Sequence, residues 1–153
     1  MNIRYAKEND SCKLDQLFSK LLNYERDNYD INIKQSLNIT GFFIKRINKI
    51  DNIILLAEEE NEIIGYIYGY IRSNNKIKIE IESYIESIFI EDRYRNKGIG
   101  RKLIETFINE SKKRNVKYII IENKYLNTIA KKLYSDMGFN IFIESRRKEL
   151  WKY

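Results

Sequence analysis

The sequence predicts a mixed α/β layer architecture, in which helices pack on a sheet without a strict repeat of strand, helix and strand. Two observations support this class. Segments rich in β-branched and aromatic residues alternate irregularly with segments whose apolar residues recur at helical spacing. In addition, no internal repeat, low-complexity linker or charge block divides the 153 residues, which are enough for one core. We therefore expect a single domain covering residues 1–153.

The first third of the chain predicts one strand and two helical segments. Residues 2–6 have the composition of a short strand, and capping residues at positions 9–11 precede a first amphipathic helix. Positions 24–33 lack a clear period and predict a loop, which leads to a second helical segment over about residues 37–50. The apolar stripe of the first helix consists of Leu14, Leu17, Phe18, Leu21 and Leu22.

The middle of the chain predicts three strands. Residues 52–58 and 62–72 are separated by a short polar turn and predict an antiparallel hairpin. After a second polar turn at 73–75, alternating isoleucines and charged residues predict a strand that begins near residue 77 with one face in water. From residue 84 to residue 90 both faces become apolar, so this half of the strand is expected to be central and buried.

The last third predicts a helix, a strand, a second helix and one or two closing strands. Residues 99–108 place apolar side chains on one stripe, and residues 116–122 form a compact apolar strand. A helix over about residues 126–137 ends at a glycine, which is a natural C-terminal cap. Residues 139–143 are expected to begin a last strand, with residues 147–153 as its hairpin partner.

The composition narrows the chemistry. The chain has no histidine and one cysteine, Cys12, which excludes an internal disulfide, the usual zinc clusters and histidine-based relays. Acid or base chemistry must therefore use Glu, Asp, Tyr, Lys or water, and we expect no metal. The N-terminus lacks the apolar core of a signal peptide, and no segment has the apolar length of a membrane span, so we expect a cytoplasmic protein. The net charge of +6 suits either nucleic acid or a phosphate-rich cofactor.

A glycine turn, RNKGIG at residues 95–100, joins the buried strand to the following helix. Glycine lets backbone N–H groups approach a ligand closely, and the dipole of a helix favours negative charge at its N-terminus. Tight packing alone would also explain such a turn. Anion binding is favoured by the surrounding basic residues, which are Arg93, Arg95, Lys97, Arg101 and Lys102. The turn is therefore a candidate diphosphate cradle.

Glu86 lies in the strand half that is expected to be buried. Burial disfavours the charged form of a carboxyl group and can tune it for work as a general base near neutral pH. A carboxylate at the sheet surface under a loop, or a structural partner of a Lys or Arg residue, explains the sequence equally well.

The last predicted helix carries two polar side chains and a small residue on one strip. Asn127, Ala130 and Tyr134 share this strip because seven residues make almost two helical turns. The small side chain of Ala130 leaves room for a ligand along the helix. The Tyr134 hydroxyl could donate a proton to a leaving group, although a buried tyrosine that anchors the core is the commoner explanation.

Together these parts resemble the GNAT superfamily of acyl-CoA-dependent N-acetyltransferases. The turn at residues 95–100 matches the family's Arg/Gln-x-x-Gly-x-Gly/Ala pattern, and the buried strand carries Glu86. The distal motif consists of Asn127, Ala130, Leu133, Tyr134, Gly138 and Phe139. The proline that usually precedes the turn is absent. The resemblance implies a mostly antiparallel twisted sheet of six to seven strands, splayed at the cofactor site and flanked by about four helices.

The resemblance also implies roles for individual residues. Backbone amides of the turn would hold the pyrophosphate of CoA, and the strand before it would pair with the pantetheine arm. Tyr134 would protonate the departing thiolate, and Glu86 matches the position of a base that acts directly or through water. The implied catalytic residues are thus Glu86 and Tyr134. The implied cofactor-binding residues are Ile88, Phe89, Ile90, Arg95, Asn96, Lys97, Gly98, Ile99, Gly100, Arg101, Asn127 and Tyr134.

The expected function is transfer of an acetyl group from acetyl-CoA to a primary amine of a small molecule, peptide or protein, by direct attack in a ternary complex. An acyl-CoA-binding regulatory or sensor module with little turnover is the alternative. A nucleic-acid-binding surface is disfavoured because no stacking motif or recognition helix is apparent. No membrane partner is expected, and a homodimer is left open.

The acceptor site is expected to lie between residues 21–41 and 141–152, which shape it in the family. Five residues of the first of these segments could receive a cationic amine, namely Tyr24, Glu25, Asp27, Tyr29 and Asp30. An acidic, solvent-exposed loop is the commoner explanation of this composition.

Overall fold

A mixed five-stranded sheet forms the centre of the computed structural model, which describes residues 1–35, 37, 39–72 and 79–150. The strands are β1 (Asn2–Tyr5), β2 (Asn52–Glu59), β3 (Glu62–Arg72), β4 (Glu82–Ile90) and β5 (Tyr118–Ile121), and they lie in this order across the sheet. The first four pair antiparallel, whereas β5 pairs parallel with β4. The predicted α/β class and the mostly antiparallel sheet are confirmed.

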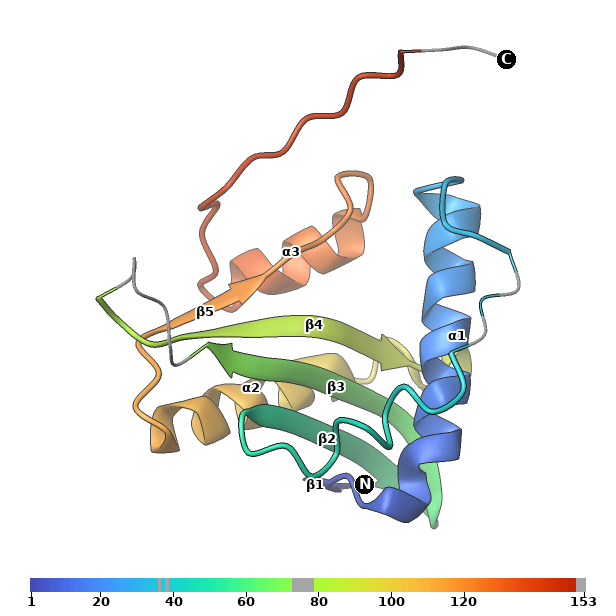
Figure 1. Ribbon diagram of the computed structural model, residues 1–153, viewed down its shortest axis with the longest axis vertical. Coiled ribbons are helices and arrows are strands. Elements are labelled where there is room, and N and C mark those ends of the chain that lie inside the picture. Colours follow the sequence, from blue (N-terminus) through green and yellow to red (C-terminus); the bar gives the residue numbers. More distant parts are fainter. Residues whose placement is uncertain (36, 38, 73–78, 151–153) are drawn as a thin grey trace.

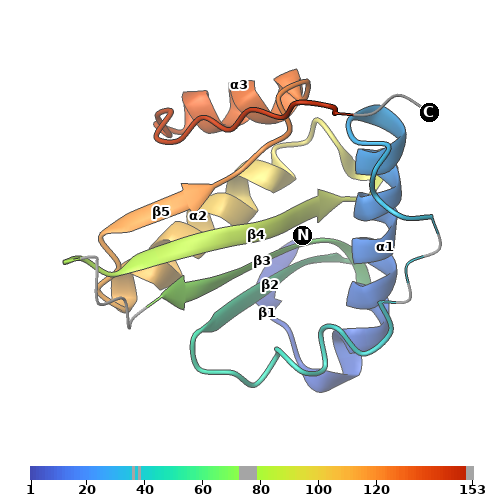
Figure 2. The same ribbon diagram turned by 45° about the horizontal axis from the view of Figure 1, so that its top comes forward.

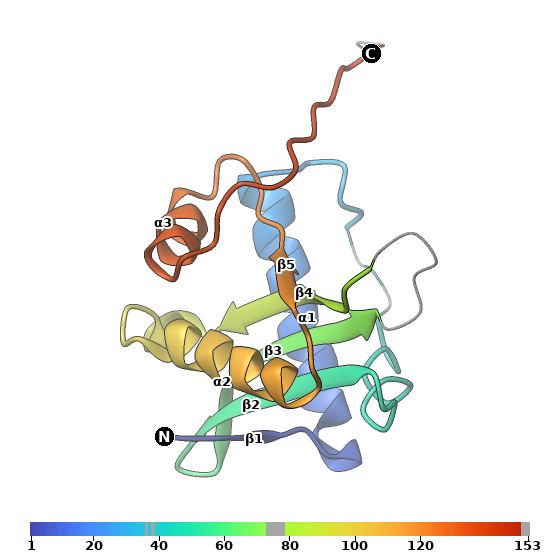
Figure 3. The same ribbon diagram turned by 90° about the vertical axis from the view of Figure 1, so that its left-hand side faces the viewer.

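Three helices pack around this sheet (Figure 1). Helix α1 (Ser11–Asn28) covers one face, and α2 (Ile99–Lys113) covers the other, so that α2 lies in front of the strands and α1 behind them in Figure 3. Helix α3 (Thr128–Asp136) lies beyond β5, as Figure 2 shows, and contributes Tyr134 to the same core as α2. No helix in the described part of the chain has both the length and the apolar character needed to cross a membrane.

The central strands are apolar on both faces because each face is covered by a helix. In β2, five consecutive residues from 53 to 57 are buried, and their side chains alternate between two cores. Leu55 packs on the α2 side, whereas Ile54 and Leu56 pack on the α1 side with Leu14 and Leu17. The sheet therefore separates two hydrophobic layers.

A β-bulge at Glu86 interrupts the pairing of β3 with β4. Tyr68 lies opposite Ser87, and the next pair joins Gly69 to Ile85, so Glu86 has no partner on β3. A bulge adds one residue to a strand, which bends the strand and increases its twist. On its other side β4 pairs with β5 only over residues 82–85. Residues 86–90 of β4 therefore extend beyond the paired part of β5.

Gly69 lets α2 approach the sheet closely beside this bulge. A Cβ atom at this position would lie 2.2 Å from the carbonyl oxygen of Tyr84 and 2.6 Å from Cζ of Phe107. Phe107 belongs to α2 and is fully buried. Only glycine leaves room for both contacts, since any other residue would overlap with backbone and ring atoms.

Two predicted elements are wrong. Residues 39–50 form successive turns rather than a helix, because Gly41 has a φ of 80° and Asp15 accepts hydrogen bonds from the backbone N–H groups of Gly41 (2.7 Å) and Phe43 (3.0 Å). Residues 139–150 contain no strand. The described sheet thus has five strands instead of six or seven, and three helices instead of about four pack around it.

Three predicted features fall wholly or partly outside the described residues. They are the turn at 73–75, the strand start at 77–78 and the end of the closing hairpin at 151–153. Ile79 and Ile81 are described, and both precede β4, which begins at Glu82. Ile79 is 99% exposed, so the expected strand with one face in water does not include this residue.

Asp15 should be important for stability. Replacing Asp15 with alanine is expected to lower the free energy of unfolding by about 2 kcal/mol, because the N–H groups of Gly41 and Phe43 lose their acceptor. Urea titration measures this change. Asp27→Ala is the control, since Asp27 is largely exposed and pairs with its neighbour Arg26. Equal, small effects of both substitutions would contradict the prediction.

Candidate active site

The predicted diphosphate cradle is the turn that leads from β4 into α2. Gly98 is the N-cap residue of α2 and has a left-handed φ of 77°, which glycine adopts without strain. Asn96 also has a positive φ, of 60°. The first N–H groups of α2, beginning at Ile99, have no acceptor within the helix. The turn therefore presents backbone donors at the positive end of the helix dipole.

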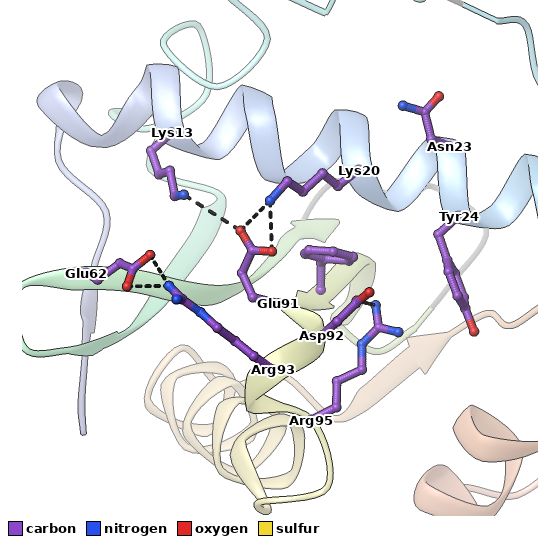
Figure 4. Close-up of a pocket in the computed structure, with 10 residues that line it drawn as sticks. Lys13, Lys20, Asn23, Tyr24, Glu62, Glu91, Asp92, Arg93 and Arg95 are labelled. Carbon is purple, nitrogen blue, oxygen red and sulfur yellow. Dashed lines mark hydrogen bonds and ion pairs between the residues drawn. The ribbon is translucent and has the colours of Figure 1, made fainter.

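A cavity of about 590 Å³ adjoins the turn on the α1 side (Figure 4). Its basic side chains are paired with carboxylates: Lys20 contacts Glu91 at 2.7 Å, and Arg93 contacts Glu62 at 2.5 Å. The lining residues are Lys13, Lys20, Asn23, Tyr24, Glu62, Phe89, Glu91, Asp92, Arg93 and Arg95. Of the basic residues that the sequence places beside the turn, Arg93 and Arg95 are thus paired with carboxylates.

The other basic residues of the turn remain available for an anion. Among the described residues, Lys97, Arg101 and Lys102 form no ion pair, and Lys97 and Lys102 are exposed. Two groups of donors could therefore bind a diphosphate here, namely the N–H groups at the start of α2 and these three side chains.

Arg95 connects the turn to β4 and α1 instead of pointing into solvent. Its Nε donates a hydrogen bond to the carbonyl oxygen of Ile90 at 3.0 Å, and its guanidinium contacts Asp92 at 2.8 Å. The guanidinium also lies 4.9 Å from the ring centre of Tyr24 and 5.4 Å from that of Phe89. Arg95 thus braces the cradle against its neighbours.

The predicted pantetheine-binding residues lie where β4 leaves β5. The side chain of Phe89 is buried on the α1 side, whereas Ile88 and Ile90 are half-buried on the α2 side. Because the pairing with β5 covers only residues 82–85, the backbone groups that follow meet no paired strand on that side. An extended ligand with amide groups could hydrogen-bond to this edge as an added strand does.

Helix α3 lies directly beside the cradle. A Cβ atom on Gly100 would lie 3.7 Å from Cδ2 of Leu133, which places the start of α2 next to α3. Asn127 is the N-cap of α3, and its side-chain oxygen accepts a hydrogen bond from the N–H of Ala130 at 3.0 Å. The predicted strip on α3 therefore begins at a capping residue whose amide nitrogen is still available.

Tyr134 is the buried end of this strip. It is 8% exposed, and its hydroxyl makes no hydrogen bond among the described residues. Burial raises the pKa of Tyr134 to about 12, and the negative charge of Glu25 contributes to this increase. The hydroxyl therefore stays protonated at neutral pH and can act as a proton donor.

The expectation that Glu86 is buried is wrong. Its side chain is exposed, although its neighbours Ile85 and Ser87 are buried. Alternation along a regular strand would bury Glu86, but Glu86 is the extra residue of the bulge, where alternation no longer assigns a face. A base at this position would work from the solvent side, through water.

The site contains a second carboxylate, on Glu25 of α1. Burial raises the pKa of Glu25, which nearby Lys124 partly offsets and Asp30 reinforces. Its carboxylate makes no hydrogen bond or ion pair among the described residues. The same charge raises the pKa of Tyr66 and of Tyr134, which both belong to the neighbouring core layers. Glu25 is thus an unpaired, half-buried charge close to the predicted acid.

Two buried hydroxyl groups lie in the same region. Tyr66 and Ser87 are 0% and 6% exposed, and their hydroxyls form no hydrogen bond within the described structure. Burial also raises the pKa of Tyr66. Buried polar groups without partners are costly, so a ligand that supplies partners would be stabilised here.

From the sequence alone, Glu25 is only one of several acidic residues in a predicted loop. The structure extends α1 to Asn28, so that Glu25 lies on its last turns. The signal was present in the spacing, because Leu14, Phe18, Leu21 and Glu25 are separated by four, three and four residues. Glu25 continues the buried stripe of the helix.

Comparison with known proteins decides the family. A model of the acetyltransferase (GNAT) family matches residues 18–139, which is most of the chain and includes the turn and α3. The chain belongs to the GNAT acetyltransferase family. It is therefore an N-acetyltransferase, and membership of this family implies the use of acetyl-CoA. The predicted family and enzyme class are confirmed.

The alignments with individual relatives cover nearly the whole chain of this acetyltransferase. It is 26% identical over 141 residues to YhfO, an uncharacterized N-acetyltransferase of Bacillus subtilis, covering 91% of this chain and 89% of that one. It is 20% identical over 142 residues to an L-methionine sulfoximine/L-methionine sulfone acetyltransferase of Salmonella typhimurium, covering 92% and 81%. A solved structure of a BH1408 mutant from Bacillus halodurans has a TM-score of 0.89 at 20% identity, covering 99% and 100%. This likeness confirms the GNAT-like fold.

A substitution at Gly98 tests the cradle. Gly98→Val is expected to weaken CoA binding by the acetyltransferase at least about tenfold, because a β-branched residue is strained at a φ of 77° and the turn must rearrange. Isothermal titration with CoA measures the affinity. The fold should survive, since a Cβ atom at position 98 meets no atom within 4 Å.

Gly41→Val is the matched control for this substitution. Gly41 has a φ of 80°, and its Cβ would have its nearest neighbour at 3.9 Å, but it lies in the segment between α1 and β2. This variant should bind CoA normally. If a folded Gly98→Val variant binds CoA as tightly as the Gly41→Val variant, the cradle assignment is wrong.

Proposed function

We propose that this acetyltransferase transfers the acetyl group of acetyl-CoA directly to a primary amine while both substrates are bound. The main support is that α3 and α1 bring side chains to the junction of β4 and α2. The start of α2 and the end of β4 that lies beyond its pairing with β5 share a core with Tyr134 of α3, and the negative charge of Glu25 on α1 acts on Tyr134. This junction thus combines hydrogen-bond donors for a diphosphate, a strand edge for an amide-containing arm and a buried acid.

The turn and β4 are proposed to hold the cofactor. Backbone N–H groups of residues 96–101, with the side chains of Lys97 and Arg101, would contact the diphosphate, and Arg95 would keep the turn in place. The backbone of residues 88–90 would pair with the pantetheine arm, and the amide nitrogen of Asn127 would contact it from α3. These groups belong to the end of β4, the turn before α2, the start of α2 and the cap of α3.

Tyr134 and Glu86 are proposed to move the protons. Acetyl-CoA supplies an activated acetyl thioester. As the amine nitrogen forms its bond to the acetyl carbon, the bond from that carbon to sulfur breaks. An acceptor that binds as an ammonium ion first loses one proton to a water held by Glu86, because only the neutral amine has a lone pair for the attack. Tyr134 then gives its phenolic proton to the sulfur, and the second proton of the nitrogen passes to the same water and on to solvent. Exchange with solvent then restores Tyr134 and Glu86.

Glu25 is proposed to bind the acceptor as a cation. A half-buried carboxylate without a partner attracts an ammonium group strongly, because the pair forms in a medium of low dielectric constant. Lys124 offsets the charge of Glu25 only in part, since its ammonium lies 3.5 Å from Asp30, which also contacts Arg147 at 2.9 Å. The hydroxyls of Tyr66 and Ser87 would contact polar groups of the same acceptor.

An assay across a panel of amines tests this function. The panel should contain amino-acid analogues, because the Salmonella relative is an L-methionine sulfoximine/L-methionine sulfone acetyltransferase, as well as polyamines and short peptides with a free N-terminus. Release of CoA is followed with a thiol reagent, and the product is identified by mass. We expect transfer to at least one primary amine and none to the matching alcohol.

The panel also tests the alternative function, an acyl-CoA sensor. A sensor would be stabilised against heat by CoA and would acetylate no amine at any pH. That pair of results would contradict the proposed reaction while leaving the cofactor site intact. Absence of any stabilisation by CoA would instead contradict the cofactor site itself.

A further inference from the structure

Two unpaired carboxylates lie on the α1 side of the sheet. Glu25 is half-buried on the last turns of α1, and Glu86 is exposed at the bulge of β4. Among the described residues, neither carboxylate makes a hydrogen bond or an ion pair, and Lys124 offsets the charge of Glu25 only in part. Each carboxylate can therefore receive a cation from a ligand.

Glu86 lies at the cross-strand pair formed by Tyr68 and Ser87. It directly precedes Ser87, which is opposite Tyr68 on the α1 side of the sheet. Burial raises the pKa of Tyr68, and the negative charge of Glu86 adds to this increase, whereas Arg46 offsets it. Arg46 donates a hydrogen bond to the carbonyl oxygen of Phe42 at 2.8 Å and forms no ion pair with Glu86.

Glu25 lies near the next cross-strand pair on the same face, which Tyr66 and Phe89 form. Its neighbour Tyr24 contacts Arg95, whose guanidinium is 4.9 Å from the ring centre of Tyr24 and 5.4 Å from that of Phe89 (Figure 4). The charge of Glu25 also contributes to the raised pKa of Tyr66. Successive pairs on one face of an antiparallel sheet are about 7 Å apart, so the two carboxylates are separated by a distance of this order.

Two buried hydroxyls without partners belong to these same pairs. Tyr66 is 0% exposed and Ser87 is 6% exposed, and neither hydroxyl forms a hydrogen bond within the described structure. An ammonium group has three N–H donors and no acceptor. The Glu25 carboxylate and the two hydroxyl oxygens could accept all three of its hydrogen bonds. This set of acceptors therefore favours a cation over an anion or an uncharged group.

An ammonium group that Glu25 holds is nevertheless a poor nucleophile. Its nitrogen has no lone pair, and a carboxylate in a medium of low dielectric constant raises the pKa of the ammonium. The nitrogen that attacks the acetyl group must lose its proton, and exposed Glu86 is proposed to accept that proton through water. Two nitrogen atoms meet these opposite needs better than one. We propose that the acceptor is a dibasic amine, of which Glu25 holds one ammonium group while the other nitrogen reacts beside Glu86.

This inference rests on the proposed function and names the class of its acceptor. The nitrogen beside Glu86 forms its bond to the acetyl carbon as the bond from that carbon to sulfur breaks. The sulfur takes the proton of Tyr134, the reacting nitrogen gives its protons to the water at Glu86, and the ammonium at Glu25 keeps all of its protons. A separation of about 7 Å corresponds to a spacer of about four to six carbon atoms between the two nitrogens.

Matched pairs of amines test this inference. Diaminoalkanes with terminal amino groups and two to eight carbons are compared with the alkylamines of the same length, by release of CoA and by product mass. In one series of chain length, kcat/KM for the diamine should exceed that for the monoamine at least about tenfold, with the largest ratio near four to six carbons. The product should carry one acetyl group, because its only remaining amine is the one that Glu25 holds.

Replacing Glu25 with glutamine should reduce this ratio to less than about threefold, because the held ammonium loses its charged partner. Glu105→Gln is the matched control, since it also removes one negative charge but from an exposed position on α2, and it should keep the wild-type ratio. Thermal melting without CoA gives a readout that does not depend on turnover. Here 1,5-diaminopentane should stabilise the wild type more than pentylamine does, and this difference should disappear in the Glu25→Gln variant.

The possible failures of the inference and of the proposed function can be told apart. Acetylation of monoamines as fast as of diamines at every chain length would overturn the inference and leave the proposed function intact. A wild-type ratio in the Glu25→Gln variant would do the same. If CoA stabilises the protein but no amine of any kind gains an acetyl group, the proposed function fails and the inference fails with it.

Discussion

Replacing Tyr134 with phenylalanine is expected to lower kcat about 100-fold and to leave the affinity for CoA nearly unchanged. The substitution removes the proton donor and keeps the ring that packs in the core beneath α3. The hydroxyl makes no hydrogen bond among the described residues, so its loss should cost little stability. Steady-state kinetics with a fixed amine, together with thermal melting, measures both effects.

The pH dependence provides a second test of the acid. Because the pKa of Tyr134 is raised to about 12, the residue stays protonated below about pH 11, and the activity should show no alkaline decline from it up to pH 10. Tyr118→Phe is the control, since Tyr118 is 54% exposed on β5. Equal turnover of the Tyr134→Phe and Tyr118→Phe variants would remove Tyr134 as the acid.

Replacing Glu25 with glutamine is expected to raise KM for the amine about 10- to 100-fold, with a smaller change in kcat. An ammonium ion would lose a charged hydrogen bond and keep a neutral one. Glu86→Gln should show the opposite pattern, with a lower kcat and a nearly unchanged KM, because Glu86 is proposed to accept a proton through water. Each variant is thus the control for the other. A lower kcat and unchanged KM for Glu25→Gln would assign proton transfer, rather than acceptor binding, to Glu25.

Stability distinguishes a functional Glu25 from a structural one. Burial raises its pKa, so the folded state prefers the protonated form, and stability falls as pH rises through the pKa of Glu25. The Glu25→Gln variant has no carboxyl group at this position, so it does not lose stability in this way as pH rises. Its melting temperature at pH 8 should therefore equal or exceed that of the wild type, even though the acceptor binds more weakly. A marked loss of melting temperature would indicate that Glu25 holds the fold together.

The local structure of the proposed cofactor site could be predicted from the sequence because its signals are local. A glycine turn between an apolar strand and a helix needs only neighbouring residues to be recognised, and the turn at 95–100 lies where the sequence places it. The strip on α3 follows from helical spacing alone, and Asn127 and Tyr134 both lie on that helix or at its cap. The match of the family model to residues 18–139, which include both motifs, confirmed family membership and enzyme class.

The acceptor side depends on contacts between distant residues, which spacing does not reveal. The alternation of faces in a regular strand predicts that Glu86 is buried. The bulge adds one residue to β4 at this point, so the alternation does not hold there. Glu25 becomes notable only when α1 places it near Tyr66 and Tyr134, 41 and 109 positions further along the chain. The predicted closing strands were wrong for a related reason, because strand pairing depends on a distant partner and the local pattern does not show whether pairing occurs.

The contact between Gly69 and Phe107 links the interior of the sheet to cofactor binding at a distance. Phe107 lies eight residues after Ile99, so the contact is about 12 Å along α2 from the turn. A methyl group at position 69 would push Phe107 outward, and the rigid helix would transmit this movement as a tilt to its N-terminus. The packing at position 69 is thus expected to set the tilt of α2. We expect relatives to keep glycine at position 69 as strictly as in the turn, although position 69 lies away from the turn.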